Sequence, residues 1–326
     1  MNKRMMKFIS AATLLFLLVF GALAGCGTSD EGKKENNEKQ SASSEQKAFP
    51  VTFKDDSGNE VTIKEKPTKI VSVLPSTTET LFALGLDKEI VGVSDFDNYP
   101  EKVSKRQKIG SQDINVESVL ALAPDVAFIS EYHARSHANV VKQLQDAGIT
   151  TIVNNTSQST FDDTYKAIEM IAKATGTEKK AEEIVKGMKE KAATIQQKAK
   201  EVKGKKKVWI ETSAPPEMYS GGKGTFLDEL LSIIGAENVA GRQEGWIKMN
   251  EEEVVKLNPD VIVTTYGYYD KNAVNQVIER KGWQEVNAVK QKQIFDVNSD
   301  LVSRPGPRLA DGLEALAKAV YPDVYQ

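Results

Sequence analysis

The sequence predicts an α/β protein that consists of two similar lobes, a ligand cleft between them and one long helix that joins them. Three observations support this fold class. Apolar runs typical of buried strands alternate with helical segments in two parts of the chain, from Ile70 to Val153 and from Lys207 to Val320. A short sequence pattern occurs once in each part. A segment rich in Lys, Glu, Ala and Gln, residues 178–202, lies between the two parts and has helical spacing.

The repeated pattern indicates that the two lobes are copies of one unit. Residues 114–126 and 249–261 each predict a short helix, a Pro-Asp stop and an apolar strand. Residues 75–85 and 224–235 each carry an acid six residues before a closing glycine. Both patterns occur in the same order in each half, so we expect a duplicated α/β lobe. Two such lobes leave a crevice, which is a common place for a ligand site.

The N-terminal residues are expected to direct the protein out of the cytoplasm. Three cations, Lys3, Arg4 and Lys7, precede an apolar run over residues 8–24, which is typical of a secretory signal peptide. The run ends in Leu-Ala-Gly-Cys and resembles a bacterial lipobox, in which the signal is cut before a lipidated cysteine, here Cys26. Because Cys26 is the only cysteine, no internal disulfide can form. An uncleaved signal anchor is the alternative.

The expected domain boundaries follow from composition. Residues 1–25 form the predicted signal peptide, and residues 26–48, rich in Ser, Lys, Glu and Asn, form a disordered tether. The N-terminal lobe is expected over residues 49–160, a connecting helical segment over 161–203, and the C-terminal lobe over 204–326. We therefore expect the protein at the extracytoplasmic face of the cell membrane, held there by its lipid anchor.

The N-terminal lobe is expected to start with a hairpin, because Val51–Phe53 and Val61–Ile63 alternate apolar and polar residues around a turn at 56–59. Further strands are predicted at Ile70–Leu74, Ile90–Val93, Val126–Ile129 and Thr151–Val153. Helices are predicted from Pro75, at Val116–Ala123 and at Arg135–Ala147.

The connecting segment is predicted as two helices, Phe161–Thr175 and Glu178–Val202, with a break at Gly176. The second helix carries one narrow apolar stripe, formed by Ile184, Met188, Ile195 and Val202. We expect this helix to span the two lobes, because the α/β pattern starts again after it. A coiled-coil or interaction helix is the alternative.

The C-terminal lobe repeats the alternation of strands and helices. Strands are predicted at Lys207–Ile210, Val261–Thr265 and Ile294–Val297. Helices are predicted at Thr225–Ile234, from Asn250, at Asn272–Arg280 and at Arg308–Val320, with a loop that runs through Trp246. Thr225 is the expected N-cap of its helix.

The composition does not favour catalysis or nucleic-acid binding. A net charge of -3 offers no basic surface for a nucleic acid. With one cysteine and two histidines, His133 and His137, few groups are available for Ser-His-Asp or Cys-His catalysis. The two histidines could form half a metal site with Glu131 as a third ligand, but we expect them at polar positions near the cleft. We expect no enzyme, no resident cofactor and no metal; a surface-anchored metal-dependent enzyme is the alternative.

Aromatic side chains are concentrated in predicted loops, mostly just after strands, where open α/β sheets bind ligands. They are Phe96, Tyr99, Tyr132, Tyr219, Trp246, Tyr266, Tyr268 and Tyr269. Together they predict a broad and partly apolar ligand. The chosen ligand-binding candidates are Phe96, Tyr99, Tyr132, Trp246 and Tyr266. Arg304 and Arg308 join them, because they could bind carboxylate, amide or phosphate groups of the ligand.

Several motifs together resemble one protein family. The lipobox, the tether, the Pro75–Glu79 motif, the paired Pro-Asp-Val strands and the Arg304–Arg308 motif resemble the iron-siderophore, haem and cobalamin binding proteins of ABC importers. The resemblance covers roughly residues 51–322. It implies two Rossmann-like lobes joined by one rigid helix. It also implies a monomeric binding lipoprotein that delivers its ligand to a permease dimer with its ATPase.

The resemblance further implies one glutamate at the top of each lobe that docks on arginines of the permease. By position these are Glu79 and Glu229. Ser76 to Glu79 also fits a capping box, whereas in the second lobe the box ends at Asp228 and leaves Glu229 free. A helical wheel places both glutamates away from the apolar positions of their helices. Asp228 is the alternative docking acid.

Within the family, residues 94–100, Trp246 and the Arg308 region look most like the cobalamin binders. In those proteins aromatic residues at the positions of Phe96 and Trp246 face the corrinoid, although Phe96 lacks the hydroxyl group of the family pattern. Cobalamin or another corrinoid is therefore the expected ligand, with a ferric siderophore or haem as alternatives. A siderophore would favour lysines and arginines, and haem could use His133 or a tyrosine as axial ligand.

Overall fold

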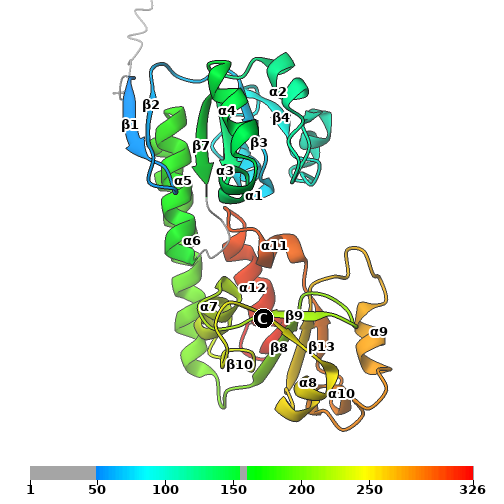
Figure 1. The fold of residues 1–326 in the computed structure, drawn as a ribbon. Helices are drawn as coiled ribbons and strands as arrows, with labels where there is room; N and C mark the ends of the chain where they lie inside the picture. The colour runs from blue at the N-terminus through cyan, green and yellow to red at the C-terminus, as the bar shows by residue number, and fades with distance from the viewer. Residues whose placement is uncertain (1–48, 155–159, 326) are drawn as a thin grey trace, which may run out of the picture. The chain divides into compact units, whose positions relative to one another are not determined.

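The computed structural model describes residues 49–154 and 160–325 (Figure 1). The described residues form one compact unit. The predicted signal peptide, the tether and Cys26 lie outside the described residues. In the described ranges no helix is both long enough and apolar enough to cross a membrane.

The N-terminal lobe is built on a sheet with the strand order β5-β4-β3-β6-β7, in which all neighbouring strands are parallel. Its strands are β3 (Ile70–Ser72), β4 (Ile90–Val93), β5 (Gln107–Lys108), β6 (Val126–Ser130) and β7 (Thr150–Asn154). The chain runs from β3 to β4 on one side and returns to β6 on the other. The strand order therefore reverses between β3 and β6, and open α/β sheets bind ligands at such a reversal.

Helices connect these strands, and an antiparallel hairpin of β1 (Val51–Lys54) and β2 (Glu60–Ile63) precedes them. The helices are α1 (Pro75–Ala83), the 3₁₀ turn η1 (Glu101–Lys105), α2 (Val116–Leu122), α3 (Glu131–Ser136) and α4 (Ala138–Asp146). The prediction of one helix at 135–147 is wrong. Ser130 caps an earlier helix, α3, and His137 leaves helical geometry with φ -126° and ψ 38°.

The internal repeat is confirmed in detail. Asn115 caps α2, and Asn250 caps α8 (Glu251–Leu257), each through its side chain. The two helices end on left-handed residues with φ 46°, Ala123 and Asn258, directly before Pro-Asp. Each Pro-Asp aspartate then accepts hydrogen bonds from backbone amides at the start of the neighbouring strand. The same sequence pattern therefore builds the same local structure in both lobes.

The connecting segment consists of α5 (Phe161–Thr175) and α6 (Glu178–Lys198). Gly176 ends α5 in the left-handed region with φ 66°, which confirms the predicted break. Of the predicted stripe, Met188 and Ile195 on α6 are buried and Ile184 is partly buried. Val202 is also partly buried, but it lies beyond the end of α6 at Lys198, so the predicted end of this helix is wrong. This face packs against α5 and α12 (Leu309–Val320) of the same chain (Figure 1), which favours the connecting role over a coiled coil.

The C-terminal lobe has a parallel sheet with the order β10-β8-β12-β13. Its strands are β8 (Lys207–Glu211), β10 (Glu237–Asn238), β12 (Val261–Thr264) and β13 (Ile294–Asp296). Its remaining helices are α7 (Phe226–Ile233), α9 (Ala273–Ile278), α10 (Asn287–Lys290) and α11 (Ser299–Ser303). The strand order reverses between β8 and β12, as it does between β3 and β6 in the first lobe.

A second, antiparallel sheet in this lobe was not predicted. It pairs β9 (Met218–Gly221) with β11 (Trp246–Met249), and Trp246 lies opposite Gly221. The predicted loop through Trp246 is therefore wrong, because Trp246 begins a strand. The pairing holds the Trp246 backbone in place, which matters for its role in a binding site.

Candidate ligand-binding site

A pocket of about 620 Å³ lies where residues of both lobes meet. The N-terminal lobe contributes Pro75, Phe96 and Asn98. Thr212 and Thr265, which directly follow β8 and β12, line it from the other side and mark the strand reversal of the C-terminal lobe. The further lining residues are Leu227, Trp246, Tyr268, Ser299, Asp300, Val302, Ser303 and Arg304. We call this cavity the interlobe pocket.

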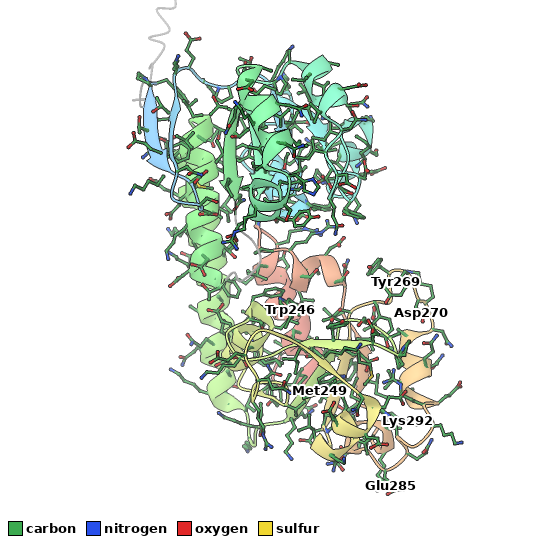
Figure 2. The ribbon with its side chains drawn as sticks, viewed as in Figure 1. Trp246, Met249, Tyr269, Asp270, Glu285 and Lys292 are labelled. Atoms are coloured by element: carbon green, nitrogen blue, oxygen red, sulfur yellow. The ribbon has the colours of Figure 1, made fainter. Side chains whose placement is uncertain are left out.

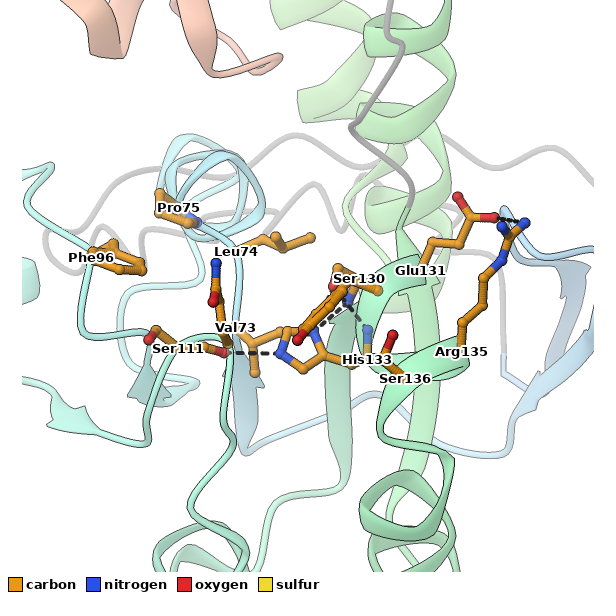
Figure 3. Close-up of a pocket in the computed structure, with 12 residues that line it drawn as sticks. Val73, Leu74, Pro75, Phe96, Ser111, Ser130, Glu131, His133, Arg135 and Ser136 are labelled. Atoms are coloured by element: carbon orange, nitrogen blue, oxygen red, sulfur yellow. Dashed lines mark hydrogen bonds and ion pairs between the residues drawn. The ribbon is translucent and has the colours of Figure 1, made fainter. Parts of the chain in front are cut away.

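A second pocket of about 550 Å³ lies at the strand reversal of the N-terminal lobe (Figure 3). Residues after β3 and after β6 line it, as the topology predicts. The lining residues are Val73, Leu74, Pro75, Phe96, Ser111, Gln112, Ser130, Glu131, Tyr132, His133, Arg135 and Ser136. We call this cavity the N-lobe chamber. It shares Pro75 and Phe96 with the interlobe pocket, so the two cavities adjoin.

The structure places several predicted ligand-binding residues around these cavities. Phe96, Trp246 and Arg304 line the interlobe pocket, and Tyr132 lines the N-lobe chamber. Phe96 and Trp246 are exposed, with exposed fractions of 64% and 46%. Figure 2 shows Trp246 on the side of the C-terminal lobe that faces the N-terminal lobe. Large exposed rings in a cavity offer apolar contact area to a ligand.

Tyr266 lines neither pocket, so the prediction that it contacts the ligand is wrong. Its side chain is fully buried, and its hydroxyl donates a 2.7 Å hydrogen bond to Glu211. Glu211 also accepts hydrogen bonds from Trp209 and from both terminal nitrogens of Arg280. Burial, followed by the charge of Glu211, raises the pKa of Tyr266 far above its usual value. Tyr266 is therefore part of a buried polar network.

The tyrosine that does line the pocket is Tyr268, which was not among the predicted ligand-binding residues. It lines the interlobe pocket and is 65% exposed. Tyr269 lies between the two, stacked on Tyr266 at 5.8 Å and edge-on to Tyr268 at 4.8 Å. The Glu211 network thus anchors the loop that presents Tyr268. Three tyrosines within four positions gave no signal in the sequence to separate the buried ring from the exposed ones.

Glu79 is not the outward-facing carboxylate that the helical wheel indicated. It is buried on α1, where Arg308 binds it through two hydrogen bonds of 2.7 Å and Arg304 through one of 3.0 Å. Nor does it form the predicted capping box, because α1 begins after Leu74 without a side-chain cap. The predicted docking acid and the two predicted ligand-binding arginines therefore form one cluster.

The same cluster holds the loop that carries Phe96. Arg304 donates to the Phe96 carbonyl and to the Asn98 side chain, and Asn98 donates to Asp300 at 2.9 Å. The Arg308 guanidinium lies 3.8 Å from the ring centre of Tyr99. Tyr99 and Arg308 line neither pocket. Their cation–π contact stabilises the loop that carries Phe96.

Glu229 is half-buried and accepts a 2.8 Å hydrogen bond from the Phe161 amide. Burial raises its pKa. Asp228 accepts from the Asn238 side chain at 2.9 Å, and the Thr225 side chain caps α7 as predicted. Both acids of the second lobe are therefore engaged within the chain, and the choice between them as docking residue stays a prediction.

Both histidines lie beside the N-lobe chamber, but His133 is buried rather than at the surface. Its Nε2 donates to the Ser111 carbonyl at 2.9 Å, so Nδ1 is the acceptor that meets the Ser130 hydroxyl at 2.5 Å (Figure 3). Burial lowers the pKa of His133, so the ring is neutral with both nitrogens engaged. His137 Nε2 lies 3.2 Å from the Tyr132 hydroxyl. Among the described residues no group of three or more His, Cys, Asp or Glu could hold a metal ion.

The charges that line the two pockets cancel. In the N-lobe chamber the ionised pair is Glu131 with Arg135 (Figure 3). In the interlobe pocket Arg304 pairs with Asp300 at 2.9 Å and also with Glu79. Neither lining contains a charged side chain without an opposite charge beside it. The cavities therefore combine exposed aromatic rings with hydrogen-bonding groups and no net charge.

Comparisons with known proteins are consistent with a binding protein of this architecture. A family model described as "Periplasmic binding protein" matches residues 70–301. An uncharacterized ABC transporter substrate-binding lipoprotein of Bacillus subtilis is 46% identical over 312 residues, which covers 95% of this chain and 96% of that protein. A cobalamin-binding protein of Halobacterium salinarum is 26% identical over 283 residues, 84% of this chain and 75% of that protein.

A solved structure from Staphylococcus epidermidis is also similar. It is described as a possible iron-binding, periplasmic solute-binding protein. It superposes with a TM-score of 0.71 at 33% sequence identity, and the match covers 79% of this chain and 100% of that one. Similarity of this extent supports the two-lobe fold.

Proposed function

This chain belongs to the periplasmic binding protein family of ABC transporters, and we propose from that premise that its ligand is a corrinoid, most simply cobalamin. Members of the family are binding components of transport systems rather than enzymes. The protein acts outside the cytoplasm and passes its ligand to an ABC importer. The proposal concerns which ligand it carries and how it is held.

The observation that carries the proposal is the interlobe pocket with its aromatic rings and balanced charges. Phe96, Trp246 and Tyr268 offer flat apolar surfaces to a macrocycle. The macrocycle of a corrinoid carries uncharged amide side chains, which need hydrogen bonds but no free cations; the one anionic group of cobalamin is a phosphodiester outside the macrocycle. Haem carries two carboxylates, and many ferric siderophores are anions, so both call for unpaired arginine or lysine. Arg304 is already paired with Glu79 and Asp300.

Relatives give this choice independent support. The Halobacterium salinarum protein that aligns with 84% of this chain is a cobalamin-binding protein. At 26% identity such a relative suggests a ligand class without fixing it. The match to a possible iron-binding protein at 33% identity keeps an iron chelate, bound as a ferric siderophore or as haem, as the second candidate.

Calorimetric titration of the purified protein tests the proposal. Cyanocobalamin, haem, the neutral siderophore complex ferrichrome and the anionic complex ferric enterobactin serve as ligands in parallel. We expect saturable binding of cyanocobalamin at one site per chain, and weaker or no binding of the anionic ligands. Saturable binding of haem or of a siderophore with none of cyanocobalamin would replace the corrinoid with that ligand. No binding of any ligand would refute a metal-chelate carrier.

The proposal extends to the membrane and the permease. Lipidation of Cys26 would hold the protein at the outer face of the cytoplasmic membrane. Glu229 would then contact an arginine of the permease. Glu79 could do the same only by leaving Arg304 and Arg308, since it is buried against them. Glu229, which is half-buried, is therefore the more accessible docking acid.

A further inference from the structure

The segment that joins α6 to β8 carries a dense group of lysines. Residues 198–207 contain six lysines and one acid, Glu201. Five of these lysines are exposed, whereas Lys206 is partly buried and donates to the Val320 carbonyl at 2.8 Å. The exposed ones are Lys198, Lys200, Lys203, Lys205 and Lys207. We call these five side chains the lysine turn.

The lysine turn has a positive charge that the protein itself does not neutralise. In the part of the chain that the structure describes, none of its five lysines forms an ion pair. Earlier on α6 the lysines are balanced, because Lys180 pairs with Glu183 at 2.7 Å and Lys191 pairs with both Asp311 and Glu314. The charge along α6 is therefore compensated until its last residue and uncompensated beyond it.

Few carboxylates lie near the lysine turn. Glu201 is exposed within the segment, and Glu237 lies opposite Lys207 in the pairing of β10 with β8. Asp260 is already engaged, because it accepts hydrogen bonds from the Lys207 amide and from the Asn287 side chain. The positive charges outnumber these three acids, so the surface attracts anions over about 10 Å, which is the Debye length at moderate salt.

The lysine turn lies at the opposite end of the C-terminal sheet from the ligand site (Figure 1). β8 begins at Lys207 and ends at Glu211, and the next residue, Thr212, lines the interlobe pocket. Leu227, in the first turn of α7, lines the same pocket, so Glu229 also lies at the cleft end of the lobe. A partner bound at the lysine turn would therefore leave the pocket and the proposed docking acid uncovered.

The lipid surface is the anionic partner within reach of a tethered protein. The expected lipidation of Cys26 and the predicted tether, residues 26–48, would keep the folded part close to the membrane. At up to about 3.5 Å per residue, such a tether can span roughly 80 Å. Laid end to end, α5 and α6, with 15 and 21 residues, span only about 54 Å. Clusters of four to eight basic residues beside a membrane anchor are typical of binding to anionic headgroups.

We propose that the lysine turn binds the phosphate headgroups of anionic phospholipids and so sets a resting orientation of the protein on the membrane. The inference rests on the membrane location proposed above, but not on the choice of ligand. In this orientation the amino ends of the C-terminal strands face the lipid, and the interlobe pocket faces away from it toward incoming ligand. Ammonium groups bind phosphate as flexible point charges, so the contact is reversible and the protein can turn over to dock.

The reactivity of individual lysines tests this contact. The chain is purified from cell membranes with the anchor that it carries there. It is then reconstituted in two kinds of vesicle, one of phosphatidylcholine alone and one with an equal part of phosphatidylglycerol. An amine-reactive ester labels exposed lysines, and mass spectrometry follows the labelling rate at each position.

We expect labelling of the lysine turn to slow about three-fold or more on the anionic vesicles, because contact with phosphate covers each ammonium group and keeps it protonated. The slowing should disappear at about 1 M salt, where charges are screened beyond about 3 Å. Lys54, Lys105 and Lys281 serve as internal controls. They are exposed and, within the described ranges, form no ion pair, so their labelling should be the same on both kinds of vesicle.

Two variants of equal net charge make the result specific. The first removes three charges of the lysine turn through Lys198→Gln, Lys203→Gln and Lys205→Gln. It should abolish the slowing at Lys207, which remains as a reporter. The second replaces the three control lysines with glutamine instead. It should keep the slowing at Lys207, because the lysine turn is intact.

The outcomes that overturn the proposal are distinct. Equal labelling of the lysine turn on both kinds of vesicle would show that it does not bind anionic lipid. Slowing that persists at high salt would show a contact that is not electrostatic, and slowing lost in both variants would assign the effect to overall charge. Slowing on intact cells without slowing on anionic vesicles would assign the surface to an anionic polymer of the cell wall. A chain that does not stay with either vesicle would refute the membrane location itself, which is seen before any labelling.

Discussion

Glu79 shows how one side chain can carry a role that its own helix does not reveal. It lies on α1, and its two partners, Arg304 and Arg308, come from the opposite end of the chain. A buried carboxylate with three such hydrogen bonds stabilises the contact between the N-terminal lobe and the C-terminal segment. Removing one partner of a buried ion pair is costly, because the other charges stay buried without compensation.

The variant Glu79→Ala should therefore be strongly destabilised. We expect the free energy of unfolding to fall by about 3 kcal/mol, measured by urea denaturation. Glu183→Ala is the matched control, because Glu183 pairs with Lys180 at the surface of α6, where ion pairs contribute little. A Glu79 variant as stable as the Glu183 variant would mean that the arginine cluster contributes nothing to the fold.

Asp97 gives a pH-dependent prediction at the same scale. Its carboxylate is buried beside Thr78, Lys108 and Arg304, and burial raises its pKa from 3.8 to about 6. The Asp97 carboxyl group ionises near pH 4 in the unfolded chain and near pH 6 in the folded protein. Stability is therefore greatest below pH 4 with respect to this group, and it is lost as the pH rises through 6.

Asp97→Asn removes the charge and keeps the shape. Relative to this variant, the wild-type protein should lose stability between pH 4 and pH 7, by ~3 kcal/mol at most. Thermal unfolding of both proteins across this range measures the difference. A difference that does not change with pH would show that Asp97 titrates as it does in the unfolded chain.

At the scale of elements, the helices and strands with local sequence signals were predicted correctly, whereas those stabilised by contacts with distant parts of the chain were missed. β4 and α5 have the predicted bounds, because a bounded apolar run and a capped helix are visible in the sequence. β9 and β11 were missed, since each is short and is stabilised by a partner strand far along the chain. The burial of Glu79 was missed for the same reason: its arginines lie more than 200 residues away.

The residues of the candidate site were likewise predictable only in part. Phe96 and Tyr132 could be predicted because they follow apolar strands, where open α/β sheets bind ligands. Trp246 could be predicted because its position resembles an aromatic position of the cobalamin binders. Tyr266 could not be separated from Tyr268, because only the fold shows that Glu211 buries one of them. Sequence patterns thus located the region but not the orientation of each ring.

The break between α5 and α6 depends on one glycine. Gly176 has φ 66°, and an added Cβ would lie 3.1 Å from the Phe49 ring. Gly176→Ala should therefore lower the free energy of unfolding by about 1–2 kcal/mol. Gly187→Ala is the matched control within α6, where nothing lies within 4 Å; it should raise stability by about 0.5–1 kcal/mol. Chemical denaturation measures both, and equal effects would contradict the account of the break.

At the scale of the whole molecule, one apolar core extends from the N-terminal sheet through α5 and α6 into the C-terminal sheet. It includes Ile70 and Phe128 of the first lobe, Met188 of α6, and Val208 and Leu230 of the second lobe. A continuous core of this kind favours a rigid connection between the lobes. Ligand capture is then expected to depend on side chains and loops at the cleft.

The proposed docking of Glu229 on a permease gives a prediction at the scale of the whole molecule. Glu229→Gln keeps an acceptor for the Phe161 amide but removes the charge. We expect ligand uptake by cells to fall several-fold, because charge complementarity mainly affects encounter and orientation. Binding of the ligand should not change. Glu285→Gln, on the far side of the C-terminal lobe (Figure 2), is the matched control. Normal uptake with Glu229→Gln would exclude Glu229 as the docking acid.

The most direct test of the corrinoid proposal is a tryptophan fluorescence titration with cyanocobalamin. Trp209 and Trp283 are buried in the C-terminal lobe, so Trp246 is the tryptophan that lines the interlobe pocket. We predict saturable quenching in the wild-type protein, and a smaller signal with weaker binding in Trp246→Phe. Quenching that does not saturate, or that is the same in both proteins, would contradict a corrinoid held between Phe96 and Trp246.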